Sequence, residues 1–354
     1  MEKVYFVTNR QPDDAANPTD FGKDFSADGV ANLRYGYARV SGSKFDKHDI
    51  AVAEEQLNLD KDKGCVAPDS VFGSQAIMAQ VRKEMTSKHR DTLVYIHGYN
   101  VTFKEALTAA AKLASRLKPH NDGHGVNVVL FSWPSDGSAM PYLAYASDRQ
   151  DAAPSGPAFA RAFLKLADFL QGASPEEECD HSLHLLAHSM GNYVLRHAVQ
   201  EIRNYYPGRP PRIFDQIFMM AADEDDDTFE HSYKLGVLPR LARRVNVYFN
   251  HGDVALQISD KTKGHPDRLG TDGPRLPQQV PAKVTQVDCT PVVTGTVEHS
   301  YYIDSARVVK DMLEVLAGIP SDEIKGRDYV PETNRYRLQG KPANRKKAKK
   351  KRRR

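Results

Sequence analysis

Cysteine is scarce in this chain of 354 residues, which has only Cys65, Cys179 and Cys289. They are widely separated and form no CxxC pair, which suits a reducing compartment. Long hydrophobic runs are also absent, because no apolar stretch approaches the roughly 18 to 20 residues needed to cross a bilayer. The first ten residues lack the basic and apolar regions of a secretory signal. We therefore expect a soluble, cytoplasmic protein.

Charge is unevenly distributed along the chain. Lysine and arginine together number 49 and aspartate and glutamate 46, so the formal net charge is +3. Nine of the ten residues 345–354 are basic, however, and residues 1–344 alone carry a formal charge of −6. With 40% hydrophobic and 27% charged residues, the chain has the content of an ordinary globular protein. We expect an acidic folded body followed by a basic tail.

Short β-branched or aromatic runs alternate with amphipathic helical stretches through most of the sequence. This alternation predicts an α/β fold with a mostly parallel, eight-stranded sheet and helices on both faces. The expected strands are 3–8, 33–40, 92–97, 127–133, 182–188, 212–222, 245–250 and 283–289. The expected helices are 103–117, 159–170, 190–202 and 300–316.

Residues 1–330 are expected to form a single domain. Three stretches rich in Gly, Pro, Asp or Ser do not fit the strand and helix pattern: 11–29, 139–157 and 258–281. Loops at strand ends build the substrate site in this kind of architecture, so the last two are candidate lid or pocket loops. Residues 331–354 are too poor in apolar side chains to pack and are expected to be a disordered, polybasic tail.

A serine stands between a predicted strand and a predicted helix in Ala187-His188-Ser189-Met190-Gly191. A sharp strand-to-helix turn lifts such a hydroxyl above the sheet, and small residues two positions either side keep the turn open. Gly191 meets this requirement, and Ala187 replaces the usual glycine with one extra methyl group. The amides at the start of the helix are directed at the same point. These features indicate a nucleophile; the competing interpretation is a serine that caps the helix.

A second motif, His97-Gly98-Tyr99-Asn100, follows the strand 92–97. In α/β-hydrolases the oxyanion hole combines the N–H after the nucleophile with one from the loop after an earlier strand. The N–H groups of Met190 and Tyr99 fit these two positions, and Gly98 lets the backbone approach a substrate closely. The alternative is that the motif only shapes a turn and caps the helix beginning near Thr102.

The remaining members of a catalytic triad should follow the nucleophile in the order acid, then histidine. His299 lies between the last predicted strand and the last helix, where it could act as general base toward Ser189. The competing interpretation is a surface histidine. Two residues are candidates for the acid, because Asp253 follows the strand 245–250 and Asp223 follows the strand before it. We favour Asp253 and keep Asp223 as the alternative acid.

Other clusters carry weaker signals. His120-Asn121-Asp122-Gly123-His124 and the acidic run 223–227 have no recognised ligand spacing, so both are expected to be loops. His181, His184 and His188 alternate in facing on a strand and need not converge. We predict no metal site and no cofactor. The basic tail could bind nucleic acid or an anionic surface, but it lacks aromatics for base stacking, and a solvated tail is the favoured interpretation.

Several phrases resemble a known family when they are taken together. They are Phe6-Val7-Thr8-Asn9-Arg10, Tyr95-Ile96-His97-Gly98-Tyr99-Asn100, Phe131-Ser132-Trp133-Pro134, Ala187-His188-Ser189-Met190-Gly191-Asn192 and Asp267-Arg268-Leu269-Gly270. The family is a bacterial group of α/β-hydrolases first defined as a domain of unknown function and often labelled esterase/lipase-like. The resemblance covers Val4 to about Leu316 and excludes the basic tail. It implies the α/β-hydrolase fold and a serine-hydrolase assignment carried by Ser189, Asp253 and His299, but no particular substrate.

The sequence therefore predicts a hydrolase that cleaves a carboxylic ester, thioester or amide through an acyl-enzyme intermediate. Its expected partner is a small-molecule or lipid-like ester substrate. The alternative, from a different class, is a non-catalytic binding or scaffold protein on a hydrolase fold. The physiological substrate, the acyl-chain preference and the oligomeric state are left open.

Overall fold

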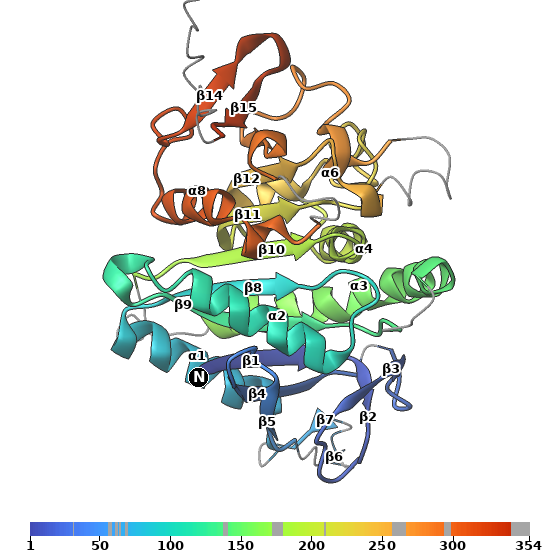
Figure 1. Ribbon diagram of the computed structural model, residues 1–354. Helices are drawn as coiled ribbons and strands as arrows, with labels where there is room; N and C mark the ends of the chain where they lie inside the picture. The colour runs from blue at the N-terminus through green and yellow to red at the C-terminus, as the bar shows by residue number, and fades with distance from the viewer. Residues whose placement is uncertain are drawn as a thin grey trace, which may run out of the picture.

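The computed structural model contains one large sheet with helices packed on both of its faces (Figure 1). It describes residues 1–30, 32–55, 59–60, 63, 65–67, 70–136, 141–171, 180–208, 210–256, 267–293 and 299–340. Among these residues, no helix is both long and apolar enough to span a bilayer. The predicted α/β architecture is confirmed.

All eight predicted strands are present, and three further strands extend the sheet to eleven. The predicted ones are β1 (Glu2–Thr8), β4 (Arg34–Ser41), β8 (Asp91–Ile96), β9 (Val126–Ser132), β10 (Leu183–His188), β11 (Phe214–Met220), β12 (Ala242–Phe249) and β13 (Val284–Asp288). The added ones are β5 (Lys47–Val52), β14 (Arg327–Val330) and β15 (Arg335–Leu338). The order across the sheet is β14-β15-β13-β12-β11-β10-β8-β9-β1-β4-β5. From β15 to β1 every neighbouring pair is parallel, whereas β14, β4 and β5 join by antiparallel pairing.

Two hydrophobic clusters lie on the two faces of the sheet. Helices α1 (Gly73–Lys88), α3 (Pro141–Gln171) and α4 (Gly191–Tyr205) contribute to one cluster. Helices α2 (Phe103–Arg116), α7 (Tyr301–Asp304) and α8 (Ala306–Leu316) contribute to the other. The parallel strands are buried on both faces, which explains their nearly continuous apolar sequences.

Smaller elements complete the described chain. β2 (Arg10–Pro12) pairs with β3 (Phe21–Phe25) inside the stretch 11–29, and β6 (Leu59–Asp60) pairs with β7 (Cys65–Val66). Helix α6 (Leu269–Asp272) is a single turn. The 3-10 turns are η1 (Asn121–Gly123), η3 (Leu238–Arg240), η4 (Thr290–Val292) and η5 (Pro331–Thr333). The predicted helix 300–316 is divided at Ser305 into α7 and α8.

The expectation that residues 139–157 form a lid or pocket loop is wrong for its described part, 141–157, which is the first half of α3. Proline normally disrupts a helix interior, and Pro154 and Pro157 both lie inside this one. Small residues allow α3 to pack closely on α4: a Cβ added to Gly156 would lie 2.3 Å from the Cβ of His197. Ser155 is buried, and its hydroxyl donates to the Asp151 carbonyl at 2.8 Å. Tertiary packing therefore outweighs the proline signal.

The boundary of the expected tail is also wrong. Residues 331–340 are ordered, and β15 pairs with β13 and β14. Leu338 is fully buried, and the Arg337 guanidinium donates to the Asp288 carboxylate at 3.0 Å. A short strand with a single fully buried apolar side chain looks like a polar tail in the sequence. Residues 341–354 lie outside the described residues.

The stretch 258–281 is described only from residue 267 onward. This part packs against the ends of β11 and β12, because the N–H of Gly270 donates to the carbonyl of Ala222 at 2.9 Å and its carbonyl accepts from Asn250 at 3.0 Å. Leu269 is fully buried. Its described portion is therefore joined to the sheet beside the carboxyl ends of the strands.

Candidate active site

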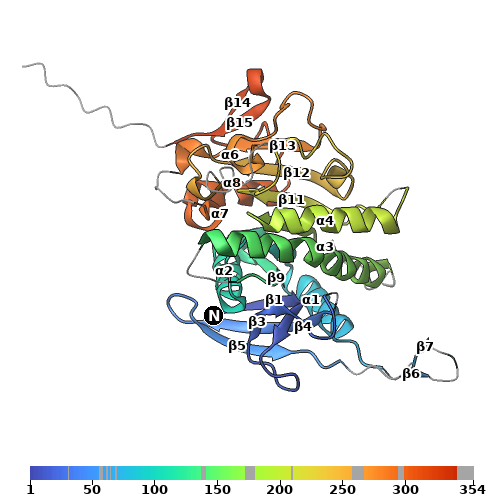
Figure 2. The same cartoon turned by 90° about the vertical axis from the view of Figure 1, so that its right-hand side faces the viewer.

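The motif around Ser189 forms a sharp turn between β10 and α4. The turn lies at the carboxyl ends of the parallel strands, which is the end of the sheet that faces the viewer in Figure 2. Ser189 has φ 52°, a left-handed conformation that non-glycine residues rarely adopt. Its N–H donates to the Met220 carbonyl at 2.9 Å, and its carbonyl accepts from the N–H groups of Asn192 and Asp223. The N-cap position of α4 is Met190, without a side-chain cap. The structure therefore does not support the capping interpretation of Ser189.

Two glycines let the loop after β8 lie against this turn. A Cβ added to Gly98 would lie 2.9 Å from the Cβ of Ser189. A Cβ added to Gly191 would lie 2.7 Å from the carbonyl oxygens of Ile96 and His97. Both approaches are closer than a real Cβ tolerates, so larger residues would push the two segments apart. The two predicted motifs are therefore in direct contact.

Buried polar side chains fix the loop 97–100 in place. The Asp148 carboxylate of α3 accepts a hydrogen bond from the N–H of Asn100 at 2.6 Å. The Arg10 guanidinium donates to the carbonyl of Val101 at 2.7 Å. Asp148 and Arg10 are almost fully buried, and burial lowers the pKa of Arg10 to about 9. Buried polar groups of this kind specify one loop conformation, because any other would leave them unpaired.

His97 is neutral and structural. Burial, reinforced by the nearby Arg10 guanidinium, lowers its pKa to about 3. Its Nδ1 bonds to the carbonyl of Gly98 at 2.7 Å, and its Nε2 accepts from the backbone N–H of Trp133 at 3.2 Å. The Trp133 indole stacks on the ring and donates to the His97 carbonyl at 2.9 Å. Both ring nitrogens are thus occupied in shaping the loop.

The N–H groups of Tyr99 and Met190 remain available to a ligand. In the described part of the chain, neither donates a hydrogen bond to a protein acceptor. Helix α2 does not use the loop as its cap either, because Thr102 caps it through a reciprocal capping box with Glu105. The capping alternative for the loop is therefore not supported.

His299 and Asp253 form a hydrogen-bonded pair. Nδ1 of His299 lies 2.8 Å from Oδ2 of Asp253, whose side chain is completely buried in the turn after β12. The other oxygen of Asp253 accepts from the N–H of Leu256 at 3.2 Å. Nε2 of His299 is buried and has no hydrogen-bond partner among the described residues. One ring nitrogen is thus fixed by an acid, and the opposite one is free to accept a proton.

His188 connects this pair to the serine turn. Its ring lies 4.8 Å from the ring of His299, and its Nε2 is 3.1 Å from the carbonyl of His299. Burial, followed by the proximity of His299, lowers the pKa of His188 well below the usual range. The neutral imidazole of His188 therefore donates a hydrogen bond to the backbone carbonyl of His299. Because His188 directly precedes Ser189, this bond links His299 to the serine turn.

Asp223, the alternative acid, has other partners. Its carboxylate accepts a hydrogen bond from the Tyr145 hydroxyl of α3 at 2.8 Å and lies 3.9 Å from Nε of Arg268. Its backbone N–H donates to the Ser189 carbonyl at 3.1 Å. Asp223 thus supports the serine turn, while Asp253 is the acid bonded to His299.

Comparison with known proteins places this fold in a family. The sequence profile of the family described as alpha/beta hydrolase of unknown function (DUF900) matches residues 74–316, more than half of the chain. The chain belongs to this family. An uncharacterised protein of Nostoc sp. (strain PCC 7120) is 23% identical over 387 aligned residues, which cover 90% of this chain and 94% of the relative. The suspected resemblance to a family of unknown function is confirmed.

A solved structure adds little to this assignment. It is a protein from Lactobacillus plantarum WCFS1 whose description as a cell surface hydrolase is itself provisional. It is 13% identical and covers 65% of this chain and 93% of its own, with a TM-score of 0.35. That similarity is too low to carry an argument about the α/β hydrolase described here.

The acidic run of this α/β hydrolase is an ion-pair network. Arg196 of α4 donates to Glu224 at 2.8 Å and to Asp225 at 3.2 Å. Arg268 and Lys234 both lie 2.8 Å from Asp225. These contacts with Arg196, Arg268 and Lys234 join the run to α4 and to the segments around it.

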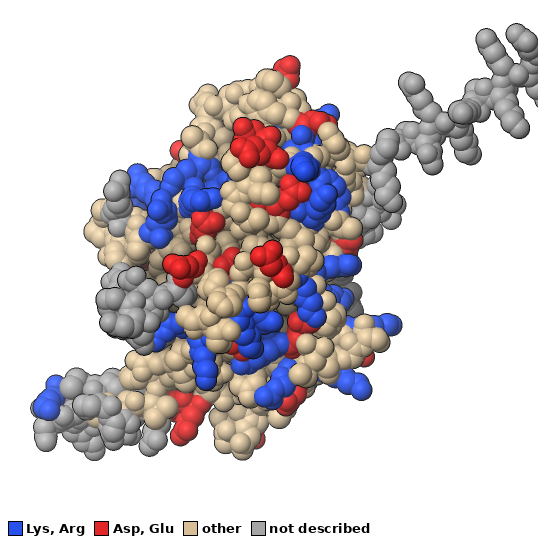
Figure 3. Space-filling view, turned by 90° about the vertical axis from the view of Figure 1, so that its left-hand side faces the viewer, with Lys and Arg blue, Asp and Glu red and all other residues tan. Residues whose placement is uncertain are grey.

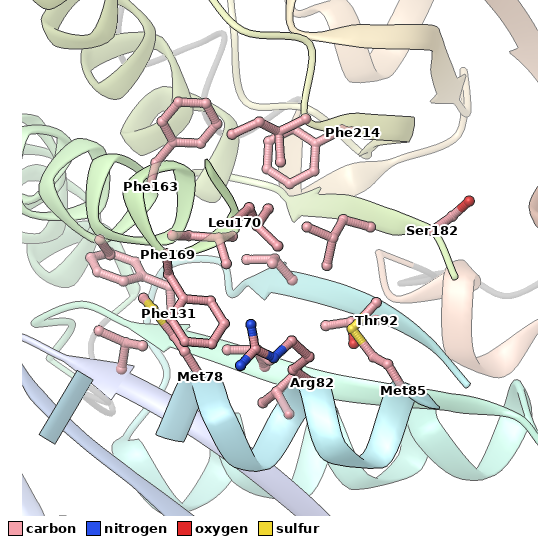
Figure 4. A pocket seen from close by; sticks show the side chains of 18 of the residues that line it. Met78, Arg82, Met85, Thr92, Phe131, Phe163, Phe169, Leu170, Ser182 and Phe214 are labelled. Atoms are coloured by element: carbon pink, nitrogen blue, oxygen red, sulfur yellow. The ribbon is translucent and has the colours of Figure 1, made fainter. Parts of the chain in front are cut away.

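A cavity of about 490 Å3 lies between the sheet and helices α1 and α3 (Figure 4). Apolar side chains of α1, α3 and the facing strands line most of it, among them Met78, Phe131, Phe163 and Phe214. Its lining includes Thr92 and Leu183, near the amino ends of β8 and β10, and does not include Ser189, which follows the last residue of β10. The pair of His299 and the buried Asp253 belongs to the carboxyl end of the sheet, which is therefore the candidate active site.

Sequence reasoning missed four residues of this site: Arg10, Asp148, Tyr145 and His188. Three of them act only through long-range contacts that no local motif encodes. The sequence did indicate that Arg10 matters, since it ends one of the phrases shared with the family. The structure shows the reason, because this buried arginine needs hydrogen-bond partners and finds one in the carbonyl of Val101. His188 was also indicated, since it lies beside the predicted nucleophile.

Proposed function

We propose that this protein is a serine hydrolase that cleaves a carboxylic ester through an acyl-enzyme intermediate. The observation that carries the proposal is the pair of His299 and the buried Asp253, joined at 2.8 Å. The His299 ring lies 4.8 Å from the ring of His188, the residue that precedes the left-handed Ser189. A buried carboxylate bonded to Nδ1 holds the imidazole with Nε2 as the acceptor and stabilises the imidazolium that forms. Family membership supports the hydrolase class and does not specify the bond that is cleaved.

In the first half-reaction, Oγ of Ser189 attacks the ester carbonyl carbon while Nε2 of His299 takes the hydroxyl proton. The carbonyl oxygen becomes an oxyanion that the N–H groups of Tyr99 and Met190 bind. Each such donor stabilises a transition state by about 3 to 4 kcal/mol in comparable sites. The intermediate collapses as His299 returns the proton to the leaving alcohol, which leaves an acyl group on Ser189.

In the second half-reaction, His299 activates a water molecule that attacks the acyl carbonyl. The same two N–H groups hold the second oxyanion, and the proton on His299 passes to Oγ of Ser189 as the acid is released. The loop carrying Tyr99 must keep its position through both steps. Its hydrogen bonds to buried Asp148 and Arg10 supply this preorganisation.

A small-molecule or lipid-like ester is the proposed substrate, with thioesters and amides as the other candidates. All three share the tetrahedral intermediate, and they differ in leaving-group basicity. A thiolate leaving group needs the least assistance from the general acid, an alkoxide needs more, and the amine of an amide needs the most. A panel of esters, thioesters and amides with the same acyl group therefore ranks the three classes directly.

The test is ester turnover by the full chain and its Ser189→Ala variant. We expect kcat to fall by a factor on the order of 10^6 in Ser189→Ala, as for removal of other activated serine nucleophiles. Ser87→Ala, which changes an exposed serine of α1, is the control and should match the wild type. Equal turnover by wild type and Ser189→Ala would show that any activity arises elsewhere. Absence of turnover across the panel would favour the non-catalytic scaffold alternative.

A further inference from the structure

A second group of functional side chains lies at the amino ends of the strands, on the opposite side of the sheet from Ser189. Asp91 is the first residue of β8, and His184 is the second residue of the neighbouring β10. His120 comes from the loop between α2 and β9. Residues 120–124 form a loop with one 3-10 turn, as expected, and nothing in the sequence required that its His120 should meet His184 at Asp91.

The three side chains meet at one carboxylate oxygen. Nε2 of His120 lies 2.7 Å from Oδ2 of Asp91, and Nε2 of His184 lies 3.5 Å from the same atom. All three candidate ligand atoms are within 4.8 Å of one another. In a tetrahedral zinc site with bonds of about 2.0 Å, neighbouring ligand atoms are about 3.3 Å apart. Sub-ångström shifts of these side chains would therefore admit an ion.

The surrounding structure holds these groups in place. His184 is fully buried and His120 nearly so, whereas Asp91 retains limited exposure and provides a path for an ion. The carbonyl of His120 accepts hydrogen bonds from the N–H groups of Gly123 and Gly125, which fixes the loop. Oδ1 of Asp91 accepts from the N–H of Ser182 at 2.8 Å. The positions of all three ligands are thus set before any ion binds.

The donor atoms at the cluster suit a cation. Asp91 offers a carboxylate oxygen, and His120 and His184 each offer one ring nitrogen. Two imidazoles and one carboxylate form a donor set that zinc and its neighbours in the first transition row prefer over magnesium or calcium.

Further histidines surround this core. Nδ1 of His181 lies 3.5 Å from Oδ1 of Asp91. The ring of His89 lies 5.7 Å from the ring of His181 and 5.8 Å from that of His124. Five of the 13 histidines of the chain thus lie at this one end of the sheet. His181 is the nearest candidate for a fourth ligand, and water is the alternative.

We propose that Asp91, His120 and His184 bind a divalent transition-metal ion, with Zn2+ as the best-fitting ion. Nε2 of each histidine gives up its contact with Oδ2 and presents its lone pair to the metal, while the ring proton resides on Nδ1. The ion would join β8, β10 and the loop before β9, and its role would be structural. The site is independent of the proposed hydrolase chemistry, which lies at the carboxyl end of the sheet.

The test is zinc binding by the full chain after removal of metal with a chelator. Calorimetric titration of the wild type with Zn2+ should show one ion per chain, and the melting temperature should rise with zinc concentration by linkage. Co2+ should produce the visible absorption of a low-symmetry, four-coordinate site. Wild-type protein that binds no Zn2+, or gains no thermal stability from it, would overturn the proposal.

Variants separate metal binding from hydrogen bonding. His120→Gln retains an amide that can donate to Asp91 but loses the imidazole, so zinc affinity should fall by at least about tenfold. Asp91→Asn should lose affinity similarly. His231→Ala, which removes a histidine paired with Asp227 at 3.2 Å, is the matched control and should bind as the wild type does. Ser189→Ala should also bind normally. Unchanged affinity in both His120→Gln and Asp91→Asn would place the bound zinc elsewhere and contradict the proposal.

Discussion

Ser189 occupies a backbone conformation that costs a non-glycine residue about 1 to 2 kcal/mol. The surrounding structure fixes that conformation, because the N–H and carbonyl of Ser189 are both hydrogen-bonded and buried Asn192 donates to the carbonyls of Ala187 and Ser189. Strain that neighbouring residues hold in place is typical of functional turns. Asn100, in the loop that faces it, is also left-handed, with φ 56°.

At the residue scale, the two candidate acids make different predictions. Asp253→Asn replaces the carboxylate that orients His299, so we expect kcat for ester hydrolysis to fall by about 10^4-fold with little change in KM. Asp223→Asn changes a residue bonded to Tyr145 and should reduce kcat far less. Steady-state kinetics of both variants give the comparison. Loss of turnover in Asp223→Asn alone would reverse the assignment of the acid.

The sequence alone left this choice open for a physical reason. Asp223 and Asp253 both follow a strand of the same sheet, so both lie at its carboxyl edge. The hydrogen bond from the Tyr145 hydroxyl to Asp223 distinguishes the two candidate acids. Tyr145 belongs to a stretch that was expected to be a loop. Ser189 and His299 could be found from the sequence because their residue types, their flanking residues and their order along the chain match a catalytic triad. Asp148 could not, since only folding brings it to the loop 97–100.

At the element scale, the misassigned segments share one cause. α3 contains two prolines, and two of the four residues of β15 are arginine, so the local sequence argued against a helix and a strand at these places. Each is stabilised by partners distant in sequence: α4 packs on α3, and β13 pairs with β15. The eight predicted strands, in contrast, could be recognised from their own sequences, because their burial requires apolar residues.

The placement of β15 can be tested with one buried side chain. Leu338→Ala removes a fully buried leucine from the hydrophobic cluster of α2 and α8, so we expect a loss of about 2 to 4 kcal/mol in the free energy of unfolding. Leu276→Ala changes an exposed leucine and should shift it by less than about 0.5 kcal/mol. Urea denaturation measures both. Equal stability of the two variants would mean that β15 contributes nothing to the core.

At the scale of the whole molecule, two candidate sites lie at opposite ends of the strands of the parallel sheet. The candidate triad lies at the carboxyl ends of the strands, and the cluster around Asp91 lies at their amino ends. On the face at the amino ends, basic side chains form separate groups with acidic ones between them (Figure 3). This arrangement suits an acidic body better than a continuous surface for nucleic acid.

Global stability should depend on pH through Glu224. Burial is the largest influence on this residue and raises its pKa to about 7. The folded state therefore keeps a proton that the unfolded state releases near the ordinary glutamate pKa of 4.5, so the free energy of unfolding falls as pH rises from about 4.5 to about 7. Glu224→Gln stays neutral and should avoid this loss. Between about pH 5 and about pH 8, the variant should gain about 2 to 3 kcal/mol relative to the wild type.

Denaturant unfolding at the two pH values checks this prediction. Glu230→Gln is the control, because Glu230 is exposed and paired with Arg275 at 2.7 Å, and its stability relative to the wild type should stay nearly constant. Parallel pH curves for the wild type and Glu224→Gln would show that Glu224 titrates alike in the folded and unfolded states.

The central claim is that Ser189 is an activated nucleophile, and covalent labelling tests it most directly. The full chain is treated with a fluorophosphonate and analysed by intact mass and peptide mapping. The account predicts one adduct per chain on the peptide containing Ser189, no adduct in Ser189→Ala, and slow labelling in Asp253→Asn. An unlabelled wild type, or equal labelling of Ser189→Ala, would contradict it.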